Sequence, residues 1–187
     1  IIDASQGEVV AEYKGKIRPD IFANLIFEFG VKYNKALVCP ENNSYGYATI
    51  LKLIEMNYPK MFYRKKAKTA FLGAYIPKSS AESAGFNTNG KTRSTILSKL
   101  EEVIRNKQLA IYSSRFYEEV KVFAWQSGRA QAKKGFNDDL VISLAIGSWL
   151  YDASDDYSKS SKKINDAMIN AFSVRQNTYQ GTPQTIF

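Results

Sequence analysis

The sequence predicts an α/β fold in which a sheet is covered by helices on both faces. Short apolar runs of strand type alternate with longer segments whose apolar residues recur at helical spacing. Strands and helices that alternate in this way form sheets with a helical layer on each side. A hydrophobic content of 44% over 187 residues is enough for one sizeable core.

Local signals define the elements of the first half of the chain. The turn Ser5-Gln6-Gly7 separates two short strands. Pro19 opens a helix with a clear apolar stripe. The expected strands are 1–3, 8–13, 36–39 and 60–63, and the expected helices are 19–29 and 47–54.

In the second half, the periodic spacing of apolar residues is absent between residues 64 and 90 and then returns. A loop this long in a compact domain is usually functional or disordered. The expected helices are 96–104 and 115–120, the expected strands are 109–112 and 122–125, and a last helix runs from about Asp138 to Tyr151. The sequence then turns polar, which divides the chain into a domain over 1–152 and an extension over 153–187. No P-loop is present, so this chain is not itself an ATPase.

The composition restricts the chemistry that the chain can perform. It contains no histidine and one cysteine, Cys39, which excludes Ser-His and Cys-His catalysis, the usual zinc sites and an intramolecular disulfide. Metal chemistry must then use oxygen ligands, which favour Mg²⁺ or Mn²⁺. The net charge of +8 suggests a polyanionic partner. A lone cysteine suits a reducing cytoplasm, and no apolar stretch reaches the roughly 20 residues that cross a membrane.

Two adjacent carboxylates, Asp138 and Asp139, stand at the start of the last expected helix. Acids are favoured in a first helical turn and Asn137 is a natural N-cap, so capping alone is about twice as frequent an explanation as function. Glu41 follows the strand 36–39, at the edge where ligands of α/β sheets gather, although an ordinary turn residue is an equally good reading. Together these carboxylates have the chemistry to hold two divalent ions about 4 Å apart over a phosphodiester.

Three basic clusters accompany the acids. They are Arg64, Lys65, Lys66 and Lys68; Lys91 and Arg93; and Arg129, Lys133 and Lys134. Each cluster taken alone is more often a solvated surface than a binding site. The third is the most suggestive, because Gly135 places it within one turn of the aspartates. Sequence-independent phosphate binding uses such clusters and predicts a steep salt dependence.

Three ordered motifs resemble the C-terminal nuclease domain of the large terminase of T-even-type tailed bacteriophages. They are Val-Cys-Pro-Glu-Asn-Asn-x-x-Gly at 38–46, Gly-Phe-Asn-Thr at 85–88 continuing to Lys-Thr-Arg at 91–93, and Gly-Phe-Asn-Asp-Asp-Leu at 135–140. The resemblance covers residues 1–152, and the ordered series is more specific than any one motif. It implies a ribonuclease H-like mixed sheet flanked by helices, and an endonuclease that cuts concatemeric double-stranded DNA with Mg²⁺ or Mn²⁺.

The resemblance also assigns roles to individual residues. Glu41 corresponds to the second acidic ligand, and Asp139, with Asp138 beside it, to the third group. The run that ends in Asp3 matches the second strand of the family's sheet, so the first strand and its catalytic aspartate are expected upstream of Ile1. Asp3 is then a strand-end residue, and this chain alone is expected to bind metal and cut DNA weakly or not at all.

The resemblance implies partners as well: an ATPase domain upstream in the same polypeptide, the portal and the small terminase subunit. The expected location is the cytoplasm of the infected bacterium, at the capsid portal, and not the mature virion. Other readings stay open. A junction resolvase or recombinase would share the fold, although the Gly-Phe-Asn-Thr segment argues against both. A non-catalytic DNA-binding or portal-docking module would use only the basic surface.

Overall fold

The computed structural model describes residues 1–64, 84–126 and 128–151. The chain divides into two compact units, Ile1–Trp149 and Leu150–Phe187. The first unit contains all of the described residues except Leu150 and Tyr151. Lys65, Lys66 and Lys68 of the first basic cluster lie outside the described residues, as does the whole of the predicted C-terminal extension, 153–187.

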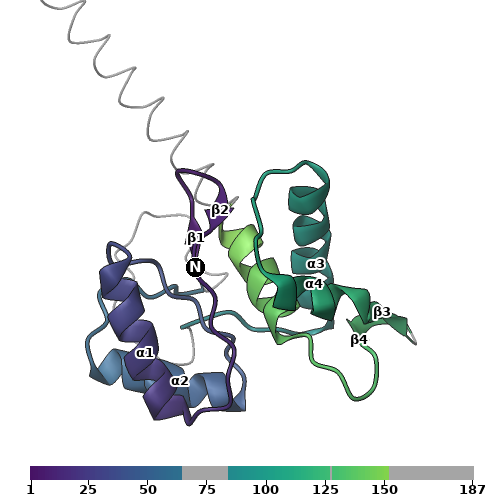
Figure 1. Cartoon of the computed structure of the whole chain (residues 1–187). Coiled ribbons are helices and arrows are strands. Elements are labelled where there is room, and N and C mark those ends of the chain that lie inside the picture. Colours follow the sequence, from purple (N-terminus) through teal and green to yellow (C-terminus); the bar gives the residue numbers. More distant parts are fainter. Residues whose placement is uncertain (65–83, 127, 152–187) are drawn as a thin grey trace, which may run out of the picture. The chain divides into compact units, whose positions relative to one another are not determined.

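The N-terminal hairpin is confirmed. Strands β1 (Ile2–Asp3) and β2 (Glu8–Val9) pair in antiparallel fashion (Figure 1), and β2 is shorter than the predicted range 8–13. The Asp3 carboxylate closes the turn, because its Oδ1 accepts hydrogen bonds from the backbone N–H and the hydroxyl of Ser5, at 2.8 and 2.7 Å. Asp3 is therefore a turn-closing residue at the end of a strand.

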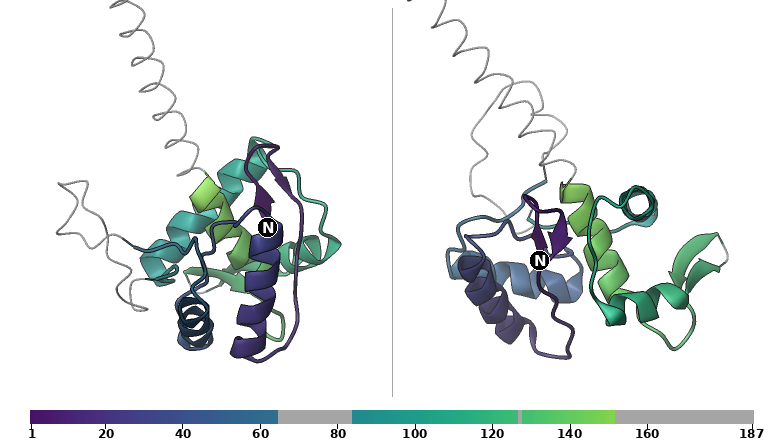
Figure 2. Two further views of the ribbon diagram at one scale, coloured as in Figure 1. Left: turned by 90° about the vertical axis from the view of Figure 1, so that its left-hand side faces the viewer. Right: turned by 45° about the horizontal axis from the view of Figure 1, so that its top comes forward.

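Helices α1 (Pro19–Lys32) and α2 (Ser44–Glu55) pack against each other, as both views in Figure 2 show. Pro19 occupies the first turn of α1, and the Asn43 side chain caps α2 by accepting from the Gly46 N–H at 2.8 Å. Ala23 and Leu53 are completely buried between the helices, together with Tyr58. The predicted ranges 19–29 and 47–54 lie within these helices, both of which follow from their apolar stripes, and Pro19 also predicts the start of α1.

The segment expected to be a buried strand at 36–39 makes only isolated parallel bridges. Val38 pairs with Met61 and Glu41 pairs with Phe86. The backbone N–H of Phe86 donates to the carbonyl of Pro40 at 2.8 Å. Leu37 is half exposed, so this segment is less buried than its apolar sequence predicts. Glu41 is itself one of the paired residues and does not follow a completed strand.

The second half of the described chain contains three helices. They are α3 (Gly90–Arg105), α4 (Ser114–Lys121) and a helix that begins at Asp139 and is described through Tyr151. Asn89 and Thr92 form a capping box at the start of α3. The buried apolar side chains include Ile96, Leu100, Val103, Phe116, Val141, Ile142 and Ala145. These helices therefore carry the larger share of the described core.

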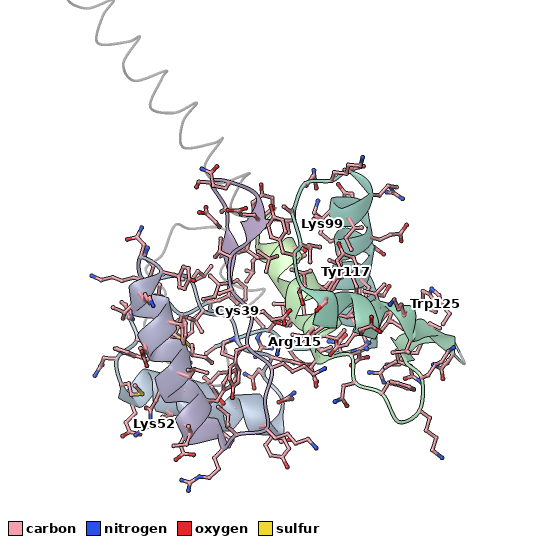
Figure 3. All side chains as sticks on the ribbon, in the orientation of Figure 1. Cys39, Lys52, Lys99, Arg115, Tyr117 and Trp125 are labelled. Carbon is pink, nitrogen blue, oxygen red and sulfur yellow. The ribbon has the colours of Figure 1, made fainter. Side chains whose placement is uncertain are left out.

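A second antiparallel hairpin joins β3 (Phe123–Gln126) to β4 (Arg129–Ala132). Strand β3 was expected, but β4 was not. Trp125 lies on β3 with most of its ring in solvent (Figure 3). The described residues thus form mixed α/β structure, with five helices and two separate two-stranded sheets in place of one continuous sheet. No helix among these residues is long and apolar enough to span a membrane.

Candidate functional site

The last helix begins one residue later than the sequence predicts. Its first helical residue is Asp139, and the carbonyl of Asp138 accepts the first intrahelical hydrogen bond, from the Ile142 N–H at 2.9 Å. Asp138, not Asn137, therefore occupies the N-cap position. An N-cap side chain normally accepts from the N–H groups two and three residues further on, which here belong to Leu140 and Val141.

Those two N–H groups are bound by a carboxylate from another helix. Oε2 of Glu119, on α4, accepts from the backbone of Leu140 at 2.8 Å and of Val141 at 3.2 Å. Glu119 is almost completely buried, and its other oxygen forms an ion pair with the Lys14 ammonium group. A buried negative charge at a helix N-terminus is also favoured by the helix dipole. The helix is thus capped by Glu119, and neither aspartate side chain performs this task.

The Asp138 carboxylate is instead held by Arg93. The guanidinium Nη2 of Arg93 lies 2.5 Å from Oδ2 of Asp138, and its Nε donates to the carbonyl of Ala130 at 3.1 Å. The same guanidinium lies 6.0 Å from the centre of the Phe123 ring. Arg93 is buried, so the ion pair joins α3, the β3–β4 hairpin and the start of the last helix. The sequence predicts Arg93 as a DNA ligand, whereas its contacts in the structure are internal.

Asp139 and Glu41 are in a different situation. Asp139 is exposed and Glu41 is half-buried, and neither side chain forms a hydrogen bond or ion pair with another described residue. Their oxygens are thus available to a ligand. The two residues are connected only indirectly, because Phe86, the pairing partner of Glu41, packs its ring against Trp149. Trp149 lies about 15 Å along the helix axis from Asp139, at about 1.5 Å per residue.

The residues expected to hold a metal are only partly suited to it as they stand. Carboxylates are the right donors for Mg²⁺ or Mn²⁺. Among the described residues, however, no group of three acidic, cysteine or histidine side chains is close enough together to hold an ion. Asp138 also has one oxygen engaged by Arg93. The donor chemistry fits, and the described geometry does not yet assemble a complete site.

The structure brings the third basic cluster, and Arg93 from the second, to one depression beside the acidic helix start. This depression has a volume of about 450 Å³ and is open to solvent. Its lining includes Arg93, Arg129, Lys133, Lys134, Phe136 and Asp138. Arg129, Lys133 and Lys134 are exposed, and Arg93 forms part of the wall from its buried position. A concave surface with this charge suits a phosphate group.

The remaining predicted DNA-binding residues lie elsewhere. Lys91 is exposed in the first turn of α3. Arg64 is half-buried and lies close enough to Cys39 to affect the thiol electrostatically. Neither residue lines the depression. The structure thus separates the first cluster, as far as it is described, from the third.

Two residues of this region, Glu119 and Lys14, were not predicted from the sequence. The sequence does contain one signal for Glu119, because it follows the buried Phe116 by three residues and so shares the inner face of α4. An acid on a buried helix face requires an internal partner. No local pattern identifies Lys14 as that partner, since 105 positions separate the two residues.

A comparison with protein-family models finds no match to this chain, and no curated protein matches it.

Proposed function

We propose that the chain is the nuclease domain of a viral DNA-packaging terminase, a Mg²⁺- or Mn²⁺-dependent endonuclease that cuts concatemeric double-stranded DNA. The proposal includes a ribonuclease H-like sheet completed by an upstream strand. It also includes an ATPase domain in the same polypeptide, and contacts with the portal and the small terminase subunit in the infected cell. Its sequence support is the ordered series of three motifs around Glu41, Arg93 and Asp139.

The main structural support for the proposal is that neither Asp138 nor Asp139 caps the helix at whose start they lie. Helix capping was the simplest alternative explanation for Asp138 and Asp139, and Glu119 performs that capping. The Asp139 carboxylate then has no partner among the described residues, although it stands in a helical turn that favours negative charge. An exposed acid beside a basic depression, without a partner among the described residues, supports a role in binding a ligand.

Each residue has a distinct part in the proposed chemistry. Glu41, Asp139 and Asp138 would hold the metal ions, which activate water and stabilise the leaving oxygen when bound. Arg129, Lys133 and Lys134 would bind the DNA backbone and keep the substrate beside the acids. Arg93 orients Asp138 by its ion pair and so limits the directions in which that carboxylate can turn.

The decisive experiment compares Asp139→Ala and Glu41→Ala with the unchanged protein in a plasmid-cleavage assay with Mn²⁺. The protein should be extended upstream of Ile1, so that the proposed upstream strand and its aspartate are included. Glu55→Ala is the matched control, because Glu55 is an exposed acid on α2 whose ion-pair partner among the described residues is Lys52. Both test variants should lose cleavage and the control should keep it. Cleavage that survives in both test variants would show that these residues are not the ligands.

A non-catalytic DNA-binding or portal-docking module is the second candidate. It is favoured by one observation, namely that the described residues offer a basic depression but no assembled group of three metal ligands. This candidate predicts salt-sensitive DNA binding without cleavage, even in the extended protein. Measuring both properties on the same preparation separates the two functions.

A further inference from the structure

The start of the last helix is capped by a residue from another helix. The first N–H groups of any helix lack intrahelical partners, and the N-cap side chain is their usual acceptor. Here the acceptor is Glu119, on α4, which binds the N–H groups of Leu140 and Val141. A short polar side chain was available locally, because Asp138 itself occupies the N-cap position.

The charge of Glu119 is also balanced inside the protein. Its side chain is 6% exposed, and a carboxylate this deeply buried requires both hydrogen bonds and an opposite charge. Leu140 and Val141 provide the hydrogen bonds, and Lys14 provides the charge. Lys14 belongs to the segment between β2 and α1, so three separate parts of the chain meet at this carboxylate.

We propose that Glu119 is a positioning residue for the acidic site: by capping the last helix it keeps the Asp139 carboxylate, and the Asp138 oxygen that Arg93 does not bind, free to bind a divalent cation. This inference rests on the function proposed above. The aspartates lie at the positions where acids most readily bind helix N–H groups. With Glu119 in place, those N–H groups are already satisfied, and the Asp139 side chain remains in solvent.

Removing Glu119 would reverse this arrangement. In Glu119→Ala the N–H groups of Leu140 and Val141 lose their acceptor, and the nearest replacement is the side chain of Asp138 or Asp139. An aspartate that turns back to cap the helix is withdrawn from the metal. Substitutions of residues that orient metal ligands typically cost about 10- to 100-fold in metal affinity or activity. Glu119→Gln keeps one acceptor oxygen for the same N–H groups, so it should recover most of the loss.

The test measures Mn²⁺ affinity by calorimetry and cleavage rate in the upstream-extended protein, for Glu119→Ala and Glu119→Gln. Leu53→Ala is the stability control, because Leu53 is fully buried in the cluster that α1 and α2 form with Tyr58, to which Glu119 does not belong. All measurements are made well below the unfolding temperature of the least stable variant. Amide exchange at Leu140 and Val141 reports the cap directly, without reference to cleavage.

The inference expects Mn²⁺ affinity and cleavage to fall by about tenfold or more in Glu119→Ala, to return largely in Glu119→Gln, and to stay unchanged in Leu53→Ala. Equal losses in Leu53→Ala, or none in Glu119→Ala, would overturn it. If the unchanged protein binds Mn²⁺ without cutting, the nuclease proposal fails, and the affinity series alone decides the role of Glu119. If the unchanged protein neither binds Mn²⁺ nor cuts DNA, both the nuclease proposal and the positioning role of Glu119 are wrong.

Discussion

The guanidinium of Arg93 and the carboxylate of Asp138 form a short ion pair, with 2.5 Å between Nη2 and Oδ2. The Arg93 side chain is 9% exposed and that of Asp138 is 24% exposed. Arg93 also donates to the Ala130 carbonyl on β4. One cation therefore fixes both the hairpin and the acidic helix start, which means that its loss should affect stability and function together.

We predict that Arg93→Ala lowers the free energy of unfolding by about 3 kcal/mol, since breaking a buried ion pair leaves the partner charge uncompensated. The Asp138 carboxylate would lose its charged donor and keep only the Ala132 N–H at 3.4 Å, and the Ala130 carbonyl would lose the Arg93 Nε–H. Urea denaturation followed by circular dichroism measures the change. The slope of the transition should be unaltered, because the surface exposed on unfolding is nearly the same.

Arg105→Ala is the matched control on the same helix. Arg105 pairs with Glu101 one turn away at 3.2 Å, and both side chains are largely in solvent. Exposed pairs of this kind contribute roughly 0.5 kcal/mol or less. If Arg93→Ala and Arg105→Ala cost the same, Arg93 is an ordinary surface residue and the role assigned to its ion pair is wrong.

The basic depression gives a second prediction, for DNA binding. Replacing Arg129, Lys133 and Lys134 together by glutamine should weaken binding to a duplex of random sequence. It should also reduce the slope of log affinity against log salt by about three, since each lost phosphate contact removes about 0.9 from that slope. Fluorescence anisotropy at several salt concentrations measures both quantities.

A charge-matched triple variant controls for the lower net charge. Lys16, Lys35 and Lys107 are exposed, and none of them lines the depression. Replacing these three by glutamine removes the same total charge and should leave the slope nearly unchanged. A similar reduction in both triple variants would mean that DNA binds diffusely, by net charge, and not at the depression.

The helices were predictable because their signals are local. Pro19 marks the start of α1, and the apolar stripes identify the buried faces. The Asn89–Thr92 capping box starts α3 at Gly90, six residues before the predicted range 96–104. The sheet was less predictable, since Glu8 pairs with Ala110 and Glu41 with Phe86, far away along the chain. No periodicity specifies such partners, and the short strands that result leave two small sheets among the described residues.

The candidate site likewise contains features that local sequence predicts and features that depend on distant parts of the chain. Asp138, Asp139 and the neighbouring basic residues were identifiable from one continuous stretch of sequence. Their environment was not, because Arg93 and Glu119 reach the helix start from other elements. Local reasoning assigned Arg93 to a DNA surface on its charge alone. Whether a charged side chain faces solvent or a buried partner depends on packing, which is a property of the whole fold.

Cys39 allows a prediction about pH. Burial raises the pKa of its thiol from 9.0 to about 12, although the nearby Arg64 acts in the opposite direction. The thiolate is the reactive form, so the native protein at pH 9 should react far more slowly with a disulfide reagent than the urea-unfolded protein does. Because the folded pKa is the higher one, the contribution of Cys39 to stability should be complete below pH 9 and should be lost as the pH rises toward 12.

Cys39→Ser provides the control for the pH prediction. This variant lacks the thiol, so its stability should decline less between pH 9 and pH 12 than that of the unchanged protein. The label in Figure 3 marks the position of Cys39. Equal reaction rates for native and unfolded protein would show that the thiol is accessible and that burial does not determine its pKa.

Close packing against the backbone accounts for the glycine at position 46, the last residue of the motif at 38–46. It lies in the first turn of α2, where alanine is ordinarily better than glycine by about 1 kcal/mol. A Cβ added to Gly46 would, however, overlap the backbone carbonyl oxygen of Glu41. Backbone atoms cannot move aside as a flexible side chain can, so the helix start and the Glu41 backbone must both shift.

We therefore predict that Gly46→Ala destabilises the protein by about 2 kcal/mol, as overpacking does, and reduces Mn²⁺ affinity by displacing Glu41. Gly90→Ala is the control, because Gly90 also lies in the first turn of a helix and a Cβ there would meet nothing within 4 Å. Its stability should be unchanged or raised by about 0.5 kcal/mol. Thermal denaturation and calorimetry with Mn²⁺ measure the two effects. If Gly46→Ala is as stable as Gly90→Ala, the close approach to Glu41 does not restrict this position. If Gly46→Ala loses stability but keeps its Mn²⁺ affinity, Glu41 is not a metal ligand.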